Sequence, residues 1–376
     1  MPDLFEQALA RLRADDLAGA GDALEKVVAA DPSHAAAHYQ LGNVRRDLGE
    51  HPAAERHFSR AVELAPGHAE AHNNLGVLQE VSGRHEQAVA SYRRAVQARP
   101  TLTQAYLNLG RLLMVLGRRD EAAQCYRDGV ASSDKPSIFA HLLAALDGRA
   151  TAAAPADYVR ATFDGFARDF DERLIGVFDY HVPEAVGRSI RRVRAFAPRS
   201  AEVLDLGCGT GLSGAVLADV AKRMVGVDVS GAMLQEARAR GCYQELAEAE
   251  ILGWMRAAAA EQFDVIVAAD VLVYFGDLVP VFAQAARLLR PGGLLAFSIE
   301  VCRDADFRLQ DSGRYAQSAA YVERLAKEHG FSVALRADQP IRKPIVGLLY
   351  VLRRRASVWK LPLLLLQAIG GRRRRA

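Results

Sequence analysis

The first 136 residues of this 376-residue chain repeat themselves with a period of 34. Four residue series keep that spacing. They are Pro32, Pro66 and Pro100; Gly42, Gly76 and Gly110; Gly49, Gly83 and Gly117; and Ala20, Ala54, Ala88 and Ala122, the last followed four residues later by Leu24, Phe58, Tyr92 and Tyr126. A fixed period means that each unit folds alike and buries its apolar face on its neighbours. The chain therefore begins with a stacked array of small units.

This pattern resembles the tetratricopeptide repeat (TPR), in which each unit is a pair of helices. Small residues let the two helices approach, the second glycine turns the chain, and the proline ends the second helix. We predict repeats over 1–34, 35–68, 69–102 and 103–136 and a closing helix over 137–146. The first repeat departs from the pattern, with Ala8 at the first glycine position and Asp15 at the turn. The tryptophan position of the family holds Leu4, His38, His72 and Tyr106. The resemblance implies a concave face that docks a protein partner, which the sequence does not identify.

Seven of the ten histidines lie in these repeats: His34, His38, His51, His57, His68, His72 and His85. They follow the repeat spacing and do not gather in a ligand cluster, so we expect groove or surface histidines and no metal site.

From Asp157 onward, apolar strands alternate with helical segments. We predict strands over 202–206, 223–228, 263–268, 294–299, 332–335 and 346–352, and helices over 182–195, 212–220, 232–240, 246–260, 278–289 and 316–329. This alternation is typical of a mostly parallel sheet with helices on both faces, here with a late antiparallel pair. The fold class is thus multidomain: an all-α TPR solenoid over 1–146, a linker over 147–156, an α/β Rossmann-like domain over 157–352 and a basic tail over 353–376.

A glycine turn follows the first predicted strand, in the stretch Val203-Leu-Asp-Leu-Gly-Cys-Gly-Thr-Gly211. Doubly wound sheets bind ligands at such turns, where glycine lets the backbone approach a ligand. The segment from Gly209 to Gly214 matches the dinucleotide pattern GxGxxG, and Asp228 suits a ribose, so a dehydrogenase is one alternative. That pattern should begin directly at the strand end, however, and Gly207 and Cys208 intervene.

The stretch also resembles motif I of class I S-adenosylmethionine-dependent methyltransferases. Val225-Gly-Val-Asp228, Ala249-Glu250, Phe263–Asp270 and Leu289-Arg-Pro-Gly-Gly-Leu-Leu295 resemble later motifs of that family, in the family's order. The resemblance implies S-adenosylmethionine as cofactor. It implies that Asp205 faces the methionine amino group, that Asp228 holds the ribose, and that Asp270 lies near the methyl group. The other implied cofactor residues are Gly207, Cys208, Gly209, Gly211, Val229, Met233, Ala249 and Glu250.

The segment Phe163–Asp171 resembles the amino-terminal cap of ubiquinone-biosynthesis-type and Williams–Beuren-region-type methyltransferases. The resemblance implies a helix that folds over the cofactor; the alternative is a helix that only packs on the core. Acceptor-side candidates lie near strand ends, loops or the cap: Tyr158, Phe166, His181, Tyr274, Glu300, Arg314 and Tyr315. No spacing among them identifies a general base.

The sequence therefore predicts methyl transfer to an unidentified acceptor, with a small molecule favoured and a protein docked by the TPRs left open. The alternative is a TPR adaptor with an inactive methyltransferase fold.

The last stretch, residues 341–376, holds ten Lys/Arg and no acid, against a net charge of +3 for the whole chain. It could rest weakly on an anionic membrane surface, touch nucleic acid or simply be solvated; no nucleic-acid partner is expected. Scattered cysteines and the lack of a signal-peptide pattern predict a cytoplasmic protein.

Overall fold

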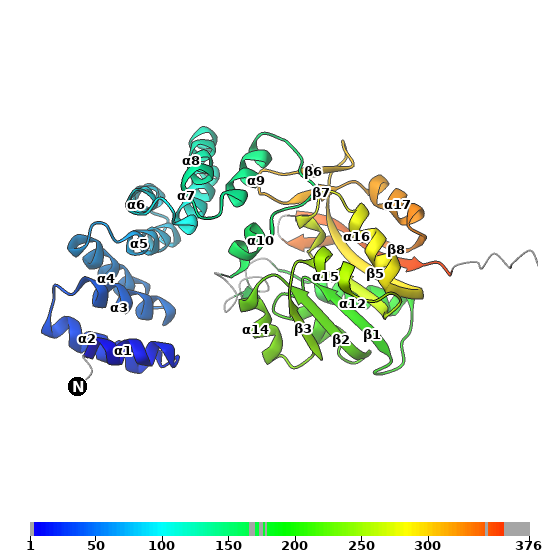
Figure 1. Ribbon diagram of the computed structural model, residues 1–376, viewed down its shortest axis with the longest axis horizontal. Helices are drawn as coiled ribbons and strands as arrows, with labels where there is room; N and C mark the ends of the chain where they lie inside the picture. Colours follow the sequence, from blue (N-terminus) through cyan, green and yellow to red (C-terminus); the bar gives the residue numbers. More distant parts are fainter. Residues whose placement is uncertain (1–3, 165–169, 173–175, 177–178, 343–344, 357–376) are drawn as a thin grey trace, which may run out of the picture. The chain divides into compact units, whose positions relative to one another are not determined.

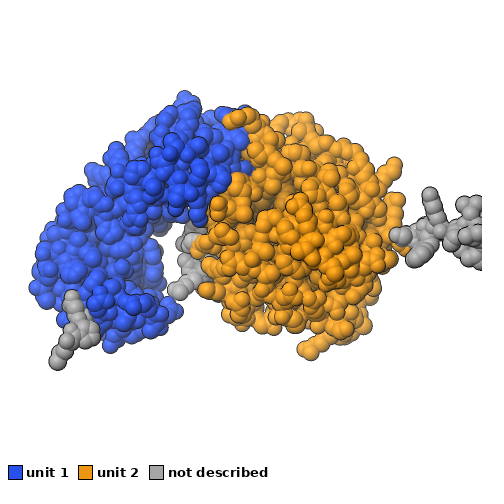
Figure 2. Space-filling model, in the orientation of Figure 1, with its two compact units in different colours: residues 1–147 blue, residues 148–376 orange. Residues whose placement is uncertain are grey.

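A computed structural model describes residues 4–164, 170–172, 176, 179–342 and 345–356. The chain divides into two compact units, residues 1–147 and 148–376, which are coloured separately in Figure 2.

The first unit consists of helix pairs, as the 34-residue period predicts (Figure 1). The pairs are α1 (Leu4–Arg13) and α2 (Leu17–Ala30); α3 (Ala35–Asp47) and α4 (His51–Leu64); α5 (Ala69–Val81) and α6 (His85–Ala98); and α7 (Thr103–Val115) and α8 (Arg119–Ser132). The closing helix is α9 (Pro136–Leu146), with one face buried through Ile138, Phe139 and Leu142. The predicted TPR array is confirmed.

The first glycine of each repeat makes room for an aromatic ring on the partner helix. A Cβ added at these glycines would lie closer than 3.0 Å to that ring. The pairs are Gly42 with Phe58, Gly76 with Tyr92, and Gly110 with Tyr126. The first repeat, which has Ala8 in place of glycine, has the smaller Leu24 in place of the aromatic residue, and both are fully buried. The glycine and ring series of the sequence are thus two halves of one contact.

The second glycine series adopts a backbone conformation that disfavours other residues. Gly49, Gly83 and Gly117 have φ values of 78°, 75° and 74° after the first helix of their repeats. Asp15, at the same position in the first repeat, has φ of 60°. The turn is therefore left-handed in every repeat, and glycine relieves its strain in three of the four.

We expect Gly110→Ala to lower the free energy of unfolding of the first unit by about 1–3 kcal/mol, because the new methyl group overpacks against buried Tyr126. Thermal denaturation measures the change. Adding Tyr126→Leu should recover part of the loss, since it recreates the Ala8 and Leu24 pair of the first repeat. Gly67→Ala is the control, because no atom lies within 4 Å of its added Cβ. Equal destabilisation by Gly110→Ala and Gly67→Ala would contradict the packing argument.

The repeat histidines correct one expectation, because His38 and His72 are buried and not at the surface. Their Nε2 atoms lie 3.3 and 2.9 Å from the carbonyl oxygens of Pro32 and Pro66. His34 Nδ1 and His68 Nδ1 each accept a hydrogen bond from the backbone three residues on, capping α3 and α5. In the described part of the chain, no three His, Cys, Asp or Glu side chains gather as metal ligands would.

The second unit is a twisted mixed sheet between helices. Its helices are α10 (Ala156–Phe163), α11 (Phe170–Glu172), α12 (Val182–Val193), α13 (Leu212–Leu217), α14 (Gly231–Ala239), α15 (Ile251–Ala257), the short 3-10 helix η2 (Leu272–Tyr274), α16 (Val279–Leu288) and α17 (Ala319–Glu328). Its strands are β1 (Ala201–Leu206), β2 (Ala221–Asp228), β3 (Glu245–Glu248), β4 (Phe263–Ala268), β5 (Leu289–Val301), β6 (Phe307–Leu309), β7 (Tyr315–Gln317), β8 (Phe331–Arg342) and β9 (Ile345–Arg354).

Strands β3, β2, β1, β4 and β5 run parallel in that order; β9 then pairs antiparallel with β5, and β8 pairs antiparallel with β9. Alternate side chains of the central strands face opposite sides. One set, which includes Val203 and Val265, packs with α12 and α13 and contributes to a core that also contains Ile190 of α12. On the other face, Phe282 of α16 packs against Phe297, with ring centroids 5.8 Å apart. The predicted fold class is confirmed.

Three predicted elements differ from the structure. The first residues of the helix predicted over 246–260 are strand β3, and the helix begins at Ile251. Ala316, predicted to begin a helix, lies in strand β7, which pairs with the end of β5. Strand β5, predicted over 294–299, begins already at Leu289, and its register with β4 shifts between Phe263 and Val265.

The structure also differs from the predicted bounds of the linker, 147–156, and of the tail, 353–376. Residues from Gly148 belong to the second unit: Ala153 bridges to Phe275, and Ala154 N donates to the Tyr274 carbonyl at 2.9 Å. Strand β9 extends to Arg354, so the tail begins later; residues 357–376 lie outside the described residues. None of the described helices has the length and apolar character that a bilayer-spanning helix needs.

Candidate active site

The glycine turn lies at the carboxyl end of β1, between β2 and β4. Gly207, Gly209 and Gly211 have φ values of 61°, 53° and 91°, which glycine adopts without strain. A Cβ at Gly207 would lie 2.6 Å from Val271, whereas no atom lies within 4 Å of a Cβ added at Gly209. The turn is packed on one side and leaves space beside its middle glycine, as a backbone cradle for a ligand requires.

Asp228, the last residue of β2, holds this turn in place. Its Oδ2 accepts from Gly209 N and its Oδ1 from Ser230 N, both at 2.9 Å. Burial raises the pKa of its carboxyl group, and the backbone N–H donors partly offset that rise. Each carboxylate oxygen has two lone pairs, so the group retains acceptor capacity for the hydroxyls of a ribose.

Asp205 lies in β1 and is almost fully buried. Tyr243 donates its hydroxyl to Asp205 Oδ2 at 2.7 Å. Burial raises the pKa of Asp205 to about 7; the bond from Tyr243 opposes the rise, and the charge of Asp228 adds to it. A buried carboxyl group of this kind gains most from a cationic partner such as an ammonium group.

Four of the other implied cofactor residues follow strands β2 and β3: Val229, Met233, Ala249 and Glu250. Val229 and Met233 are buried after β2, and Ser230 caps α14 by accepting from Met233 N. Ala249 N donates to the Asp228 carbonyl at 2.9 Å, which places Ala249 beside Asp228. Exposed Glu250 accepts from Leu252 N and Gly253 N and thereby caps α15, so its carboxylate is committed to the helix end.

The cap segment bonds to the glycine turn and to the end of β2. Ser230 donates to Asp164 Oδ1 at 2.6 Å, and Thr210, in the glycine turn, donates to Asp171 Oδ1 at 2.6 Å. Asp171 also pairs with Arg240. Phe163 packs edge-on against Tyr274, with ring centroids 5.8 Å apart. These contacts support the cap interpretation, although Phe166 lies outside the described residues.

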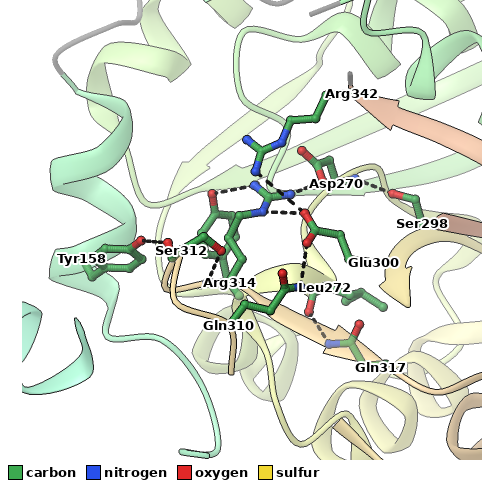
Figure 3. Close-up of polar contacts among 11 residues, drawn as sticks. Tyr158, Asp270, Leu272, Ser298, Glu300, Gln310, Ser312, Arg314, Gln317 and Arg342 are labelled. Atoms are coloured by element: carbon green, nitrogen blue, oxygen red, sulfur yellow. Dashed lines mark hydrogen bonds and ion pairs between the residues drawn. The ribbon is translucent and has the colours of Figure 1, made fainter. Parts of the chain in front are cut away.

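A buried polar cluster lies next to this region and includes three predicted acceptor-side residues (Figure 3). Arg314 donates from Nε to Glu300 Oε1 at 2.8 Å and from Nη2 to Asp270 Oδ1 at 2.6 Å. Its Nη1 lies 3.3 Å from the Tyr274 hydroxyl. Gln310 donates to the other Glu300 oxygen at 2.8 Å. The hairpin of β6 and β7 thus supplies a guanidinium to the carboxyl ends of β4 and β5.

Asp270 connects this cluster to the glycine turn. It follows β4 with φ of 56°, unusual for a residue with a side chain, and its N–H donates to Ser298 Oγ at 2.9 Å. Burial raises the pKa of its carboxyl group, and the charge of Arg314 lowers it in part. The next residue, Val271, is the one that packs on Gly207.

The other acceptor-side candidates do not join the cluster directly. Tyr158 of α10 donates its hydroxyl to the Ser312 carbonyl at 3.1 Å, so it contacts the connection between β6 and β7. Tyr315 is fully buried and bonds to Thr151. His181 is exposed at the start of α12, with Nε2 3.1 Å from Asp179. A separate surface groove, lined by Arg192, Arg336 and Arg353 among others, lies between α12 and β8, away from these residues.

Sequence reasoning missed Tyr243, Tyr180 and Arg342. Tyr180 is buried, and burial raises the pKa of its phenol, with further effects from Asp270, Arg314 and Asp205; it therefore lies within the field of both the turn and the cluster. A lone tyrosine between elements carries no sequence signal. The nearest residue among the predicted acceptor-side candidates is its neighbour His181.

Three family matches cover most of the chain. Residues 204–297 match a methyltransferase domain family. Residues 5–66 and 39–102 match one tetratricopeptide repeat family, and residues 81–146 match another.

Curated relatives share the methyltransferase part. A trans-aconitate 2-methyltransferase from an Azoarcus species is 38% identical over 102 residues, which is 27% of this chain and 39% of that protein. A ubiquinone biosynthesis O-methyltransferase from Histophilus somni is 33% identical over 104 residues, covering 26% of this chain and 44% of that protein. The chain therefore spans less than half the length of these relatives. Among solved structures, the magnesium protoporphyrin IX methyltransferase from Synechocystis with bound SAH has a TM-score of 0.41 at 17% identity, over 54% of this chain and 99% of that one.

Proposed function

We propose, from the finding that this chain joins tetratricopeptide repeats to a class I S-adenosylmethionine-dependent methyltransferase domain, that it catalyses methyl transfer to a small-molecule acceptor. The observation that carries the proposal is the arrangement at the carboxyl end of β1 and β2. There, two buried carboxyl groups flank a glycine turn that leaves space beside Gly209.

The residues of this turn fit S-adenosylmethionine chemically. Asp205 is suited to the ammonium group of the methionine moiety and Asp228 to the two ribose hydroxyls. The backbone from Gly207 to Gly211 can lie against the ligand because it carries small side chains or none. Val229 and Met233 supply apolar surface for an adenine ring. Cys208 is a buried turn residue, and burial raises the pKa of its thiol, which argues against a role as nucleophile.

The cofactor, when bound, supplies an electrophilic methyl group on a positively charged sulfur. With Asp205 and Asp228 holding the cofactor, its methyl group would pass to the acceptor atom, and the sulfur would keep the electron pair of the broken bond as a neutral thioether. The protein contributes mainly by orienting the two reactants and excluding water. A proton is lost only if the acceptor atom carries one, and Asp270, whose neighbour Val271 packs on Gly207, is one carboxylate that could accept it.

The similarity to a trans-aconitate 2-methyltransferase and a ubiquinone biosynthesis O-methyltransferase supports a small-molecule acceptor. Asp164 and Asp171 of the cap bond to Ser230 and Thr210 beside the glycine turn, as a cap close to the cofactor would require. The repeat array supports a second role, the docking of a protein partner.

Calorimetric titration with S-adenosylmethionine and S-adenosylhomocysteine tests the proposal, with NAD as the control ligand. We expect both sulfur ligands to bind in the micromolar range, and NAD not to bind. Binding of neither sulfur ligand would favour the inactive-scaffold alternative, and binding of NAD alone would favour a dehydrogenase.

A further inference from the structure

Arg342 ends β8 and directs its guanidinium toward the cluster of Asp270, Glu300 and Arg314 (Figure 3). Its side chain is 29% exposed, in contrast to 7% for Arg314 and 4% for Glu300. Its Nη2 lies 3.9 Å from Glu300 Oε1, which is an ion-pair distance and too long for a hydrogen bond. Arg342 therefore contributes charge to the cluster while remaining partly accessible.

The hydrogen bonds of the cluster show which groups are already used. Arg314 directs Nε, Nη1 and Nη2 at Glu300, Tyr274 and Asp270. Both oxygens of Glu300 accept bonds, one from Arg314 and one from Gln310. Within the described residues, no hydrogen bond occupies the N–H groups of the Arg342 side chain. Arg342 thus provides the open donors of the cluster, and Arg314 holds the cluster together.

The charges of the cluster are balanced before any ligand enters. Two carboxyl groups, Asp270 and Glu300, face two guanidinium groups, Arg314 and Arg342. A ligand that brings one negative charge makes the sum negative by one unit. A methyl donor with a sulfonium group, bound at the neighbouring turn, brings the compensating positive charge.

The position of the cluster connects it to the glycine turn. Asp270 precedes Val271, which packs on Gly207, and the electrostatic environment of buried Tyr180 includes both Asp205 and Asp270. Phe163 of the cap packs on Tyr274 of the cluster. The cluster therefore adjoins both the turn, through Val271, and Phe163 of the cap, and Arg342 approaches the cluster from β8.

We infer that Arg342 binds a carboxylate group of the methyl acceptor, so that the acceptor is a carboxylic acid held beside Asp270. The planar fork of a guanidinium matches the two oxygens of a carboxylate, and such charge-assisted pairs are stronger than neutral hydrogen bonds. Glu300 need not be displaced, because Arg314 and Gln310 retain it. The inference rests on the proposed function, since it concerns the acceptor of that reaction.

The test uses the full chain saturated with S-adenosylhomocysteine or with sinefungin, whose amine supplies the positive charge of a sulfonium group. Benzoate and succinate are the probes, and benzamide and succinamide are their neutral counterparts. Saturation-transfer NMR measures binding. We expect the carboxylates to bind at least ten-fold more tightly than the amides. We also expect them to bind more tightly to the sinefungin complex than to the S-adenosylhomocysteine complex.

Arg342→Gln should weaken carboxylate binding at least ten-fold, and Arg342→Lys, which keeps the charge without the fork, should weaken it less. Arg336→Gln is the matched control, because Arg336 lies in the same strand, is exposed and pairs with Glu323. Equal binding of carboxylates and amides, no carboxylate binding to the wild type, or unchanged binding by Arg342→Gln would overturn the inference. Retained S-adenosylhomocysteine binding in each case would leave the proposed function standing.

Discussion

Replacing Asp228 with alanine is expected to weaken S-adenosylmethionine binding by at least about 100-fold, because a hydrogen bond to a charged group contributes about 1.5–3 kcal/mol and we propose that this carboxylate accepts from two ribose hydroxyls. The loss has a second source within the protein. Asp228 holds Gly209 N and Ser230 N, so the alanine variant also releases the turn against which the ligand would lie. Calorimetric titration of both proteins measures the difference.

The Asp228→Asn variant separates the two sources of that loss. Its amide oxygen can still accept one backbone N–H, so the turn should be held better than in the alanine variant, while the charge is absent. We expect its affinity to lie between those of the alanine variant and the wild type, with a melting temperature closer to that of the wild type. Wild-type affinity in the alanine variant would exclude this residue as a ribose ligand and the turn as the cofactor site.

The pH dependence of binding is expected to follow Asp205. Because its pKa in the free protein is about 7 against an ordinary value of 3.8, the carboxyl group is largely neutral in weakly acidic solution. An ammonium ligand requires the ionised form, so affinity for S-adenosylhomocysteine should rise about ten-fold per pH unit up to about pH 7 and then level off. Titrations from about pH 5.5 to about 8 test this.

The raised pKa of Asp205 should affect folding stability in the direction opposite to its effect on binding: stability should fall as the pH rises. A carboxyl group with a raised pKa in the folded state favours folding at low pH and disfavours it as pH rises, because the unfolded chain releases the proton first. The contribution of Asp205 is therefore lost between about pH 4 and about pH 7. At about pH 8, Asp205→Asn should be more stable than the wild type by about 1–4 kcal/mol, since one pKa unit corresponds to about 1.4 kcal/mol.

Two controls identify Asp205 as the titrating group. The Asp205→Asn variant should bind weakly and with no rise in affinity toward pH 7. Tyr243→Phe removes a bond that lowers the pKa of Asp205, so the rise in affinity should move to higher pH. A pH profile that is unchanged in both variants would assign the titration to another group, with Asp228 as the nearest candidate.

The repeat unit could be predicted almost completely from the sequence, because each of its contacts recurs at a fixed spacing. The first glycine and the ring sixteen positions later mark one packing contact, and both series are visible in the sequence. The burial of His38 and His72 was not predicted, because histidine is a polar residue that is usually expected at the surface. In the structure, each ring contacts the carbonyl oxygen of a preceding proline, which satisfies one polar atom inside the core.

The second unit was predicted less well at its edges. Strand β3 reads Glu-Leu-Ala-Glu, which has helical propensity, and its pairing with β2 overrides that preference. Strands β6 and β7 have three residues each, too few to show alternation. Their hairpin nevertheless brings Arg314 into the cluster, so the connection between Arg314, Glu300 and Asp270 could not be inferred from spacing.

The cofactor-side aspartates were named from the resemblance, and their surroundings came only from the structure. Tyr243 contacts Asp205 across 38 positions of the chain, and no periodicity connects residues so far apart. Arg342 lies 42 positions from Glu300. From the sequence we placed it only among the ten Lys/Arg residues of the stretch 341–376 and did not connect it with Glu300.

The segment that precedes α10 has a consequence for how this unit can be moved between proteins. Thr151 bonds to Tyr315, Ala152 accepts from the backbone of Gly276 and Asp277, and Ala154 donates to the Tyr274 carbonyl. A chain cut at residue 157 would leave Tyr274, beside Arg314, without that support, whereas a cut before Gly148 would keep it. The smallest fragment that keeps the methyltransferase unit intact therefore includes residues 148–156, although their composition is that of a linker.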